Sequence, residues 1–521
     1  MLVTSDKHPD LDRAGLQSRA IRGAAWTAIH TFVSLPVAFL VNLLLARVLG
    51  VVDYGRLTYL TMLITVTGTI AALGVGTSVL QFGAKAHTAG RTDEVRKLLR
   101  AGSGWRLLVS APIVTLVVLA FVRLEPSFLV LVLVFGVWLP AVLGGLGIAL
   151  NIEQKTAEGA QAALIGSFFT QASVVAIVLT IGTADAVWAG RTIASALVVT
   201  LLFFFISQPY RSAVLTPGNP FRLSKQFWRF AIPTGLASVV GTLVTSRSEV
   251  LLLQWLSSPV SVGLFGLAFG LAAHIFAPAQ SFIGPLIPAV SGLAEVDPQA
   301  LRPAFLRVLR CSAIVAGLFV AGLLPAFSSL VPLLYGREFS AAASMVLVLG
   351  IFTALGLIAG PITAFIYARL RGRLILEIEI WSLSVKVAIA LASIAWLGAW
   401  GAVLASACAI TVRTAMLWIH EARHLRISRR DSLFSGAPLF LASLIAASLW
   451  IGSMWVADTP VLRGMGTGMV GIAGLVLLVR FLRLGLKTGD RDAILQAVPL
   501  RFRPIFRPLM SILVSTEHRQ L

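Results

Sequence analysis

The chain has 521 residues, of which 57% are hydrophobic and 12% are charged, and its mean hydropathy is +0.90. Soluble domains carry about a quarter charged residues, so a single large soluble core is excluded and the lipid bilayer is the expected solvent. The net charge of +20 does not indicate nucleic-acid binding, because the basic residues gather on one expected side of a membrane.

Runs of about 20 apolar residues predict an all-α polytopic membrane protein with about 14 transmembrane helices. The polar segment 1–23 is expected to be cytoplasmic and not a signal peptide. The apolar run after it is too long for a signal-peptide core, and no small-residue cleavage site follows. The expected spans are 24–49, 57–83, 104–122, 128–150, 162–181, 187–207, 230–256, 262–290, 312–335, 345–368, 374–397, 401–419, 438–456 and 462–479.

The distribution of lysine and arginine predicts the orientation of these spans. With the N-terminus in the cytoplasm, 33 of the 42 basic residues fall on the cytoplasmic side, 5 fall outside and 4 lie within spans. This is the positive-inside bias, and it predicts that both termini are cytoplasmic, beside an anionic leaflet. The stretch 501–510, RFRPIFRPLM, is expected either to rest on the membrane surface or to be a solvated tail.

A weak internal repeat predicts two lobes. The joint between the first two spans, 43–57 (LLLARVLGVVDYGRL), is similar to the joint between the seventh and eighth, 251–267 (LLLQWLSSPVSVGLFGL). Six spans separate the two joints, and an even number preserves orientation, as in a parallel repeat. We therefore expect two six-helix lobes around a central cleft, plus two C-terminal helices. The expected parts are a cytoplasmic segment 1–23, an N-terminal lobe 24–207, a cytoplasmic linker 208–229, a C-terminal lobe 230–420, helices 13 and 14 within 421–485, and a basic cytoplasmic tail 486–521.

Polar or small residues recur at helical spacing in four spans. Such a face either packs closely against another helix or lines a water-filled cavity. Two adjacent pairs of spans in matching positions favour the cavity, and prolines are expected to bend the eighth span. The residues are Thr27, Thr31, Ser34 and Asn42 in the first span; Thr58, Thr61, Thr65 and Thr69 in the second; Ser238, Thr242, Thr245 and Glu249 in the seventh; and Gly266, Gly270, His274, Ser281 and Gly284, with Pro278, Pro285 and Pro288, in the eighth.

Charged residues within spans are candidate site residues, because each costs at least ~2.5–3.5 kcal/mol on insertion scales. Arg247 and Glu249 lie two residues apart, which separates them by about 200° on a helix. Glu249 continues the polar stripe of the seventh span and is expected to face the cleft, as a positioning group or a coupling-cation site. Arg247 either clamps a neighbouring helix or reaches an anionic substrate with its fork of donors. Glu377, by contrast, is expected to pair with Arg373, one helical turn away.

Two further basic residues lie at membrane depth. Arg191, near the outer end of the sixth span, either snorkels to the interface or faces the substrate. Lys386 lies near the middle of the eleventh span, with Glu379 seven residues earlier as its candidate neutraliser, while Arg413 lies nearer the cytoplasm. The candidate substrate-binding residues are Arg247, Glu249, Arg191, Lys386, Asn42 and His274.

The sequence contains no phosphate-binding Gly-Lys-Ser/Thr loop, no His-Glu zinc motif and no Gly-x-Ser-x-Gly elbow. Cys311 and Cys408 lack metal-ligand spacing and are expected to be packing residues. We therefore expect a transporter and not an enzyme, with no cofactor and an unidentified coupling ion.

Three segments resemble the polysaccharide-transport family, the O-antigen and exopolysaccharide flippases of the superfamily that includes multidrug and toxin extrusion carriers. The most specific is the LARxLGxxxYG element at 45–55. The segment 246–268, SRSEVLLLQWLSSPVSVGLFGLA, resembles the family's seventh-to-eighth-helix segment, which usually has Asp where this chain has Glu249. The segment 396–407, WLGAWGAVLASA, is similar to its eleventh-to-twelfth turn. The resemblance covers nearly the whole chain and identifies fold and transport class better than substrate.

The resemblance implies a flippase of the bacterial inner membrane that moves undecaprenyl-diphosphate-linked oligosaccharide units from the cytoplasmic to the outer leaflet. The products would be O-antigen (lipopolysaccharide), capsule or exopolysaccharide, and the mechanism would be alternating access. The implied partners are the lipid-linked oligosaccharide, membrane lipids, a polysaccharide polymerase and glycosyltransferases, with no nucleic acid.

Three alternatives remain. A drug/cation antiporter of the same superfamily would resemble members that carry an intramembrane acid in the N-terminal lobe, whereas the cores of the first six spans contain no Asp or Glu. A peptidoglycan-precursor (lipid II) flippase would also use cationic cavity residues, and the first-helix motif argues against it. A membrane-embedded glycosyltransferase or polymerase would show paired catalytic carboxylates or a large outer loop, and neither is present.

Overall fold

The computed structural model describes residues 13–280, 297–369, 371–456 and 459–485, together with the isolated residues 286, 290, 293, 491 and 507. Within these ranges the regular structure is helical, and no strand occurs. Several sequence-based expectations lie outside the described residues. These are the eighth-span residues Ser281, Gly284, Pro285 and Pro288, and the surface segment 501–510 apart from Arg507.

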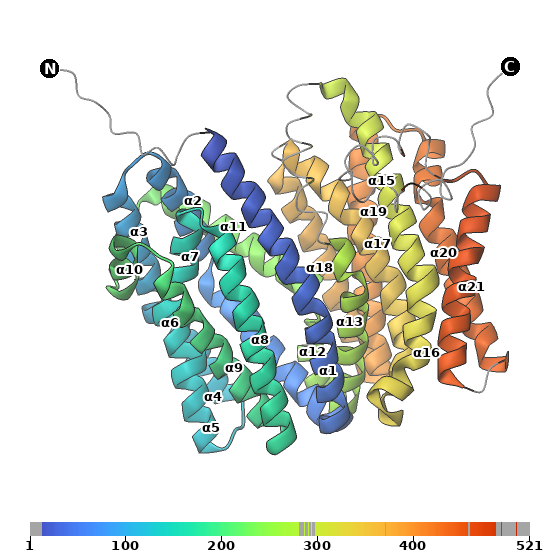
Figure 1. Ribbon diagram of the computed structural model, residues 1–521, viewed down its shortest axis with the longest axis horizontal. Helices are drawn as coiled ribbons and strands as arrows, with labels where there is room; N and C mark the ends of the chain where they lie inside the picture. The colour runs from blue at the N-terminus through green and yellow to red at the C-terminus, as the bar shows by residue number, and fades with distance from the viewer. Residues whose placement is uncertain are drawn as a thin grey trace. The chain divides into compact units, whose positions relative to one another are not determined.

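The long helices follow the expected spans in chain order (Figure 1). The helices are α1 (Arg13–Ala72), α2 (Val75–Thr88), α3 (Thr92–Trp105), α4 (Ala111–Phe121), α5 (Pro126–Leu131), α6 (Leu139–Leu143), α7 (Gly145–Ile152), α8 (Thr156–Thr180), α9 (Ala184–Leu201), α10 (Gln208–Leu215), α11 (Lys225–Thr245), α12 (Glu249–Leu256), α13 (Pro259–Gln280), α15 (Leu301–Leu318), α16 (Leu324–Tyr335), α17 (Ala342–Ala368), α18 (Gly372–Leu397), α19 (Ala399–His424), α20 (Arg429–Val456) and α21 (Pro460–Phe481).

Thirteen helices among the described residues are long and apolar enough to cross a membrane. The first of them, Ile29–Ala72, has 44 residues, or about 66 Å of helix, twice the ~30 Å of a hydrocarbon core. Gly50 bends this helix with φ 69° and ψ 179°, a left-handed conformation that a side chain would strain. The bent helix supplies two crossings, which confirms the prediction of a polytopic all-α membrane protein with about 14 spans.

The seventh span is not one helix, which corrects the expectation from the sequence. α11 ends at Thr245 and α12 begins at Glu249, so the intervening residues Ser246–Ser248 are non-helical. The break satisfies its own backbone: the Ser246 hydroxyl donates to the Thr242 carbonyl at 2.5 Å, and the Ser248 hydroxyl donates to the Leu243 carbonyl at 2.7 Å. Broken helices persist at membrane depth where the freed backbone groups find such partners.

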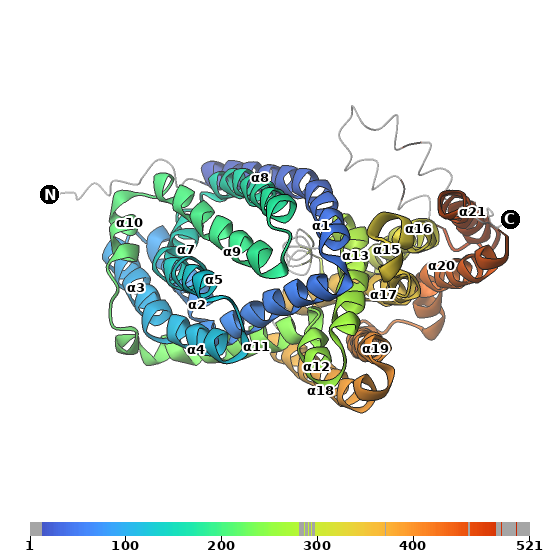
Figure 2. The same cartoon turned by 90° about the horizontal axis from the view of Figure 1, so that it is seen from below.

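The chain divides into two compact units, Met1–Leu251 and Leu252–Leu521. The first unit therefore extends past the linker 208–229, where the sequence placed the lobe boundary, and includes α11. Within this unit α1 contacts α4, α8, α9 and α11, and Figure 2 shows its two arms diverging from the corner at Gly50. α11 lies very close to the turn before α2, because a Cβ on Gly74 would fall 2.3 Å from the Ala231 carbonyl oxygen.

The second unit is built on closely packed pairs of helices. α18 packs on α19, α13 and α19 pack on α17, α15 packs on α20, and α16 packs on α21. α13, α15–α16 and α17 are the most buried of its spans. Large aromatic side chains are exposed at the ends of other spans, with Trp396 88% and Trp455 87% exposed, as expected of residues at a membrane–water interface.

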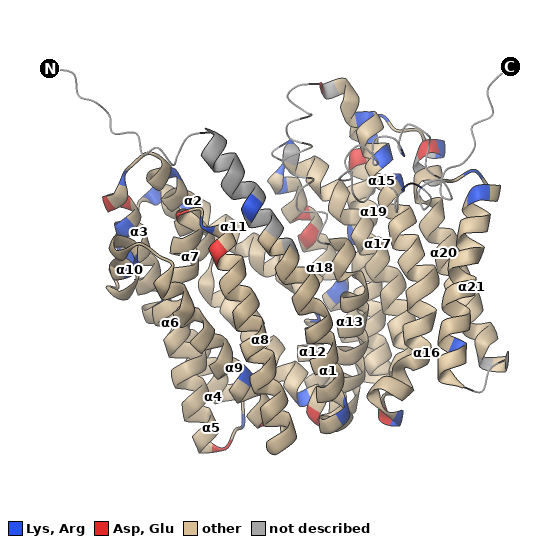
Figure 3. Cartoon of the chain, viewed as in Figure 1, with Lys and Arg blue, Asp and Glu red and all other residues tan. Residues whose placement is uncertain are grey.

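Charged residues gather at one end of each unit (Figure 3). In the first unit this end includes the start of α3, and in the second it includes the starts of α18 and α20. The helical walls between the ends are largely uncharged, which fits a multi-pass membrane protein.

Candidate functional site

Side chains close to Gly50 in the sequence hold the bend of α1 in place. The Tyr54 hydroxyl donates to the Asn42 amide oxygen at 3.0 Å, across the bend at Gly50. Arg56 forms a two-pronged pair with Asp185 at the start of α9, with nitrogen–oxygen distances of 2.6 and 2.9 Å, and donates to the Arg123 carbonyl at 2.6 Å. These contacts fix the bend against α9 and the α4–α5 connection.

Arg191 projects from α9 toward the break in the seventh span. Its side chain is exposed, yet the surrounding protein desolvates it, and its electrostatic neighbours are Arg247 and Tyr54. Within the described part of the chain, Arg191 makes no ion pair with a carboxylate. Two guanidinium groups are therefore electrostatic neighbours in this unit.

Hydroxyl-bearing faces of α1 and α11 are also accessible. On α1, Thr65 is exposed and donates to the Thr61 carbonyl at 2.8 Å. On α11, Thr245 is exposed and donates to the Gly241 carbonyl at 2.7 Å. A Cβ built on Gly241 would meet nothing within 4 Å. Because each hydroxyl hydrogen is used within its own helix, these faces present oxygen acceptors to the space beside them.

Glu249 does not continue the polar stripe of α11, which is a further correction. It is the first residue of α12 and only 2% exposed, whereas Ser238 and Thr245 on α11 are exposed. The non-helical residues before it shift its angular position, so the helical-wheel argument from the sequence does not apply. Arg247 lies in the break itself and is half-buried.

The structure places five of the six predicted site residues in two sets, and the sixth, Glu249, is buried at the start of α12. Arg191 interacts electrostatically with Arg247 and with Tyr54, and Tyr54 is hydrogen-bonded to Asn42. His274 and Lys386 lie in the second unit: His274 Nδ1 is 2.7 Å from the Gly270 carbonyl of its own helix, and Lys386 on α18 is 2% exposed. Their roles toward a substrate stay predictions. Tyr54 was missed as a site residue, although it belongs to the LARxLGxxxYG element.

Glu379 pairs with Arg413 on the neighbouring helix, a partner that the sequence did not predict. The suggestion that Glu379 also neutralises Lys386 stays a prediction. Arg413 Nε lies 2.7 Å from Glu379 Oε1, and the two side chains are 17% and 9% exposed. The partners lie on α18 and α19, 34 residues apart in the chain. The expected pair Arg373–Glu377 is confirmed, with Nε and Oε1 3.0 Å apart. The buried pair is an interhelical clamp, because both of its members are largely withdrawn from solvent.

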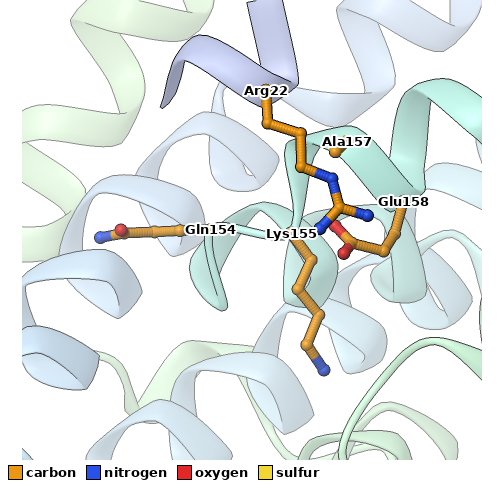
Figure 4. A pocket seen from close by; sticks show the side chains of 5 residues that line it. All are labelled: Arg22, Gln154, Lys155, Ala157 and Glu158. Atoms are coloured by element: carbon orange, nitrogen blue, oxygen red, sulfur yellow. The ribbon is translucent and has the colours of Figure 1, made fainter. Parts of the chain in front are cut away.

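A polar cavity of about 230 Å³ opens between the start of α1 and the α7–α8 turn (Figure 4). In Figure 4 the Arg22 guanidinium and the Glu158 carboxylate point toward each other, while the Lys155 side chain points away from them. Lys155 Nζ lies 2.7 Å from Glu153 Oε2 and donates to the Phe205 carbonyl at 2.9 Å. Its charge is therefore engaged by the protein. The lining residues are Arg22, Gln154, Lys155, Ala157 and Glu158.

Beside this cavity, Glu153 organises the junction between α9 and α10. It is 6% exposed and accepts hydrogen bonds from the Ser207 amide, at 3.1 Å, and from the Ser207 hydroxyl. The Tyr210 hydroxyl lies 2.8 Å from His87 Nδ1. Burial, and after it the negative charge of Glu153, raises the pKa of Tyr210, so this hydroxyl stays protonated.

The described residues hold no group of three or more His, Cys, Asp or Glu side chains placed for a metal ion.

Residues 20–293 match a family model described as polysaccharide biosynthesis protein, and no curated protein matches the chain in sequence. The structure of the lipid II flippase MurJ in an inward closed conformation is similar, with a TM-score of 0.65 and 13% identity over 88% of this chain and 99% of that chain.

Multidrug transporters share the same architecture. An inward-facing MATE family transporter of the MOP superfamily has a TM-score of 0.56 and 15% identity over 77% of this chain and 98% of that chain. A MATE transporter of Vibrio cholerae has a TM-score of 0.52 and 14% identity over 80% and 100%. At such identities the similarity shows the fold alone. The family match covers more than half of the chain, so this protein belongs to the polysaccharide biosynthesis protein family and has the fold of MOP-superfamily flippases and transporters.

Proposed function

We propose that the protein is a flippase that moves undecaprenyl-diphosphate-linked oligosaccharides from the cytoplasmic to the outer leaflet of a bacterial inner membrane. Its glycans would serve O-antigen, capsule or exopolysaccharide synthesis. Membership of the polysaccharide biosynthesis protein family supports this class of substrate. The excess of basic residues on one side supports an orientation with both termini in the cytoplasm.

The observation that carries the proposal is the pair Arg191 and Arg247, which interact electrostatically in the first unit. Two like charges raise each other's energy, and a bound anion between them relieves that repulsion. Guanidinium groups suit phosphate oxygens, because their donors match the spacing of those oxygens. The diphosphate would therefore sit at this pair.

The hydroxyl-bearing faces suit the glycan. Thr65 and Thr245 present oxygen acceptors, and sugar hydroxyls are donors as well as acceptors. A polar route is needed, since neither sugars nor a diphosphate crosses hydrocarbon unaided, whereas the prenyl tail can remain in lipid. At 100 mV, inside negative, a dianion moving outward gains about 4.6 kcal/mol, so the membrane potential favours export. Conformations open to each side in turn would complete the cycle.

A lipid II flippase is the second candidate. It is favoured by the likeness in fold to MurJ, and lipid II carries the same undecaprenyl diphosphate, so the arginine pair would serve either substrate. A cation antiporter fits less well, because two adjacent guanidinium groups repel a cationic drug. A polysaccharide polymerase and glycosyltransferases would be the partners that consume and supply an oligosaccharide substrate.

Reconstitution tests the proposal. The full chain is placed in liposomes that contain a fluorescent undecaprenyl-diphosphate oligosaccharide in both leaflets, and a membrane-impermeant reductant is added outside. Transport predicts that the label of the inner leaflet is also bleached, at a rate that rises with the amount of protein. Parallel liposomes carry labelled lipid II or an organic cation. Movement of the cation alone, with both glycolipids protected, would overturn the proposal, and movement of lipid II alone would favour the second candidate.

A further inference from the structure

Arg106 is a second cationic centre of the first unit, separate from the pair Arg191 and Arg247. It follows Trp105, the last residue of α3, and begins a π-helical turn, Arg106–Ser110, before α4. Such bulges in helices frequently occur at functional sites. They also change the angular position of the residue at the bulge.

Neutral groups hold the Arg106 guanidinium. Its Nη2 donates to the Ser103 hydroxyl at 3.1 Å, and its Nε donates to the Ala141 carbonyl at 3.4 Å. No carboxylate of the described residues lies within ion-pair distance of it, whereas the exposed Arg91, at the other end of α3, pairs with Glu94 at 2.6 Å. These two bonds orient the guanidinium, and the Nη1 edge remains available.

A glycine makes room for this guanidinium. A Cβ on Gly145 would lie 2.4 Å from Arg106 Nη2. A side chain at Gly145 would also press on Val214 of the cytoplasmic helix α10, at 2.9 Å. The guanidinium therefore occupies a notch between the end of α3 and the α6–α7 joint, and glycine is what keeps the notch open.

The surroundings place this notch at the boundary between lipid and water. Two residues further along the same turn, Leu108 is 63% exposed, as is typical of a side chain that faces acyl chains. On the other side lie α10 and the polar segment that contains Gly218, whose amide donates to the Arg100 carbonyl at 2.8 Å. Arg106 itself is half-buried, and the protein around it removes part of its hydration.

We propose that Arg106 binds the phosphate group of a lipid in the cytoplasmic leaflet, in the notch kept open by Gly145. A phosphate supplies the negative charge that the described protein does not, at the depth where lipid headgroups lie. It would accept a charge-assisted hydrogen bond from the Nη1 edge. Two lipids share this chemistry: an anionic phospholipid of the bilayer and an undecaprenyl diphosphate awaiting transport. The inference stands on Arg106 and its neighbours alone and does not depend on the proposed function.

Native mass spectrometry of the purified full-length protein tests this site. Delipidated protein is titrated separately with phosphatidylglycerol and with undecaprenyl diphosphate, and bound lipid is counted for each variant. Arg106→Gln should reduce the retention of at least one of them about tenfold, the worth of one charge-assisted hydrogen bond. Arg106→Lys should be intermediate, because it keeps the charge and loses the fork. The lipid that loses retention identifies the occupant.

Two further variants separate binding from folding. Gly145→Ala should displace the guanidinium and weaken retention while every charge remains in place. Lys97→Gln removes one positive charge from an exposed position of α3 and should bind lipid like the wild type. Wild-type retention of both lipids by Arg106→Gln and Gly145→Ala, at unchanged thermal stability, would overturn the proposal. An equal loss in Lys97→Gln would also overturn it, since the effect would then be one of general surface charge.

Discussion

Removal of one partner of the buried pair Glu379–Arg413 should strongly destabilise the protein. The two groups are 2.7 Å apart with side chains 9% and 17% exposed, and Glu379 Oε2 is buried with no hydrogen-bond partner among the described residues. In Arg413→Ala the carboxylate would stay buried without its counter-charge, which costs about 3–5 kcal/mol. At 1.4 kcal/mol per factor of ten, the unfolded population rises about a hundredfold or more.

A double-mutant cycle tests whether Glu379 and Arg413 are energetically coupled. Glu379→Gln in the Arg413→Ala background removes the stranded charge and should recover about 2 kcal/mol of the loss. The free energy of unfolding is measured by SDS titration of the purified full-length protein. The matched control is Arg373→Ala, which breaks an exposed pair on α18, the helix of Glu379, and should change stability by less than about 0.5 kcal/mol. Purely additive losses in the double variant would refute the assigned pairing.

Two other predictions concern the backbone and the topology. Gly74→Ala should destabilise the protein by at least about 1–2 kcal/mol, because Gly74 has φ +71° and its new Cβ would lie 2.3 Å from the Ala231 carbonyl oxygen. Gly68→Ala is the control, because Gly68 lies in a helix and nothing lies within 4 Å of the new Cβ. It should leave the free energy of unfolding unchanged or raise it in the same SDS titration. An equal loss of stability in both variants would contradict the close approach of α11. Reporter enzymes fused after Arg96 and after Asp458 should report the cytoplasm and the outside respectively, and a cytoplasmic signal at Asp458 would contradict the predicted orientation.

The class and the spans could be predicted because lipid imposes a strong constraint on sequence. A spanning helix needs about 20 apolar residues. Such runs can be recognised in the sequence without knowing how the helices pack. The joint between the first two spans was predicted within 43–57, and the structure places the bend at Gly50, since glycine adopts its φ of 69° without strain.

The break in the seventh span left no such pattern. Helix breaks are usually expected at glycine or proline, and the segment Ser246–Ser248 contains neither. Its serines end the helix by bonding to carbonyls of the preceding turn, which a short polar side chain can do without an obvious signature. The helical-wheel argument for Glu249 depended on a continuous helix and failed for that reason.

Ion pairs between side chains on different helices could not be predicted from the sequence, for a different reason. The pair Arg373–Glu377 follows from the four-residue period of a helix and is confirmed. The partner of Glu379, by contrast, depends on the register between α18 and α19, which the helical period does not determine. Arg191 and Arg247 were recognised singly, as charges at membrane depth, but their proximity became visible only in three dimensions.

The most direct test measures how much more tightly the protein binds a diphosphate-linked glycolipid than an uncharged one. The preference is measured before and after substitution of Arg191 or Arg247. Binding of an undecaprenyl-diphosphate glycolipid is compared with binding of the same glycan on an uncharged lipid, for the wild type and for Arg191→Gln and Arg247→Gln at matched stability. The account predicts a clear preference for the diphosphate in the wild type and a loss of about tenfold for either substitution, with uncharged glycolipid binding unchanged. An equal preference in all three proteins would contradict the claim that this pair holds the substrate's diphosphate.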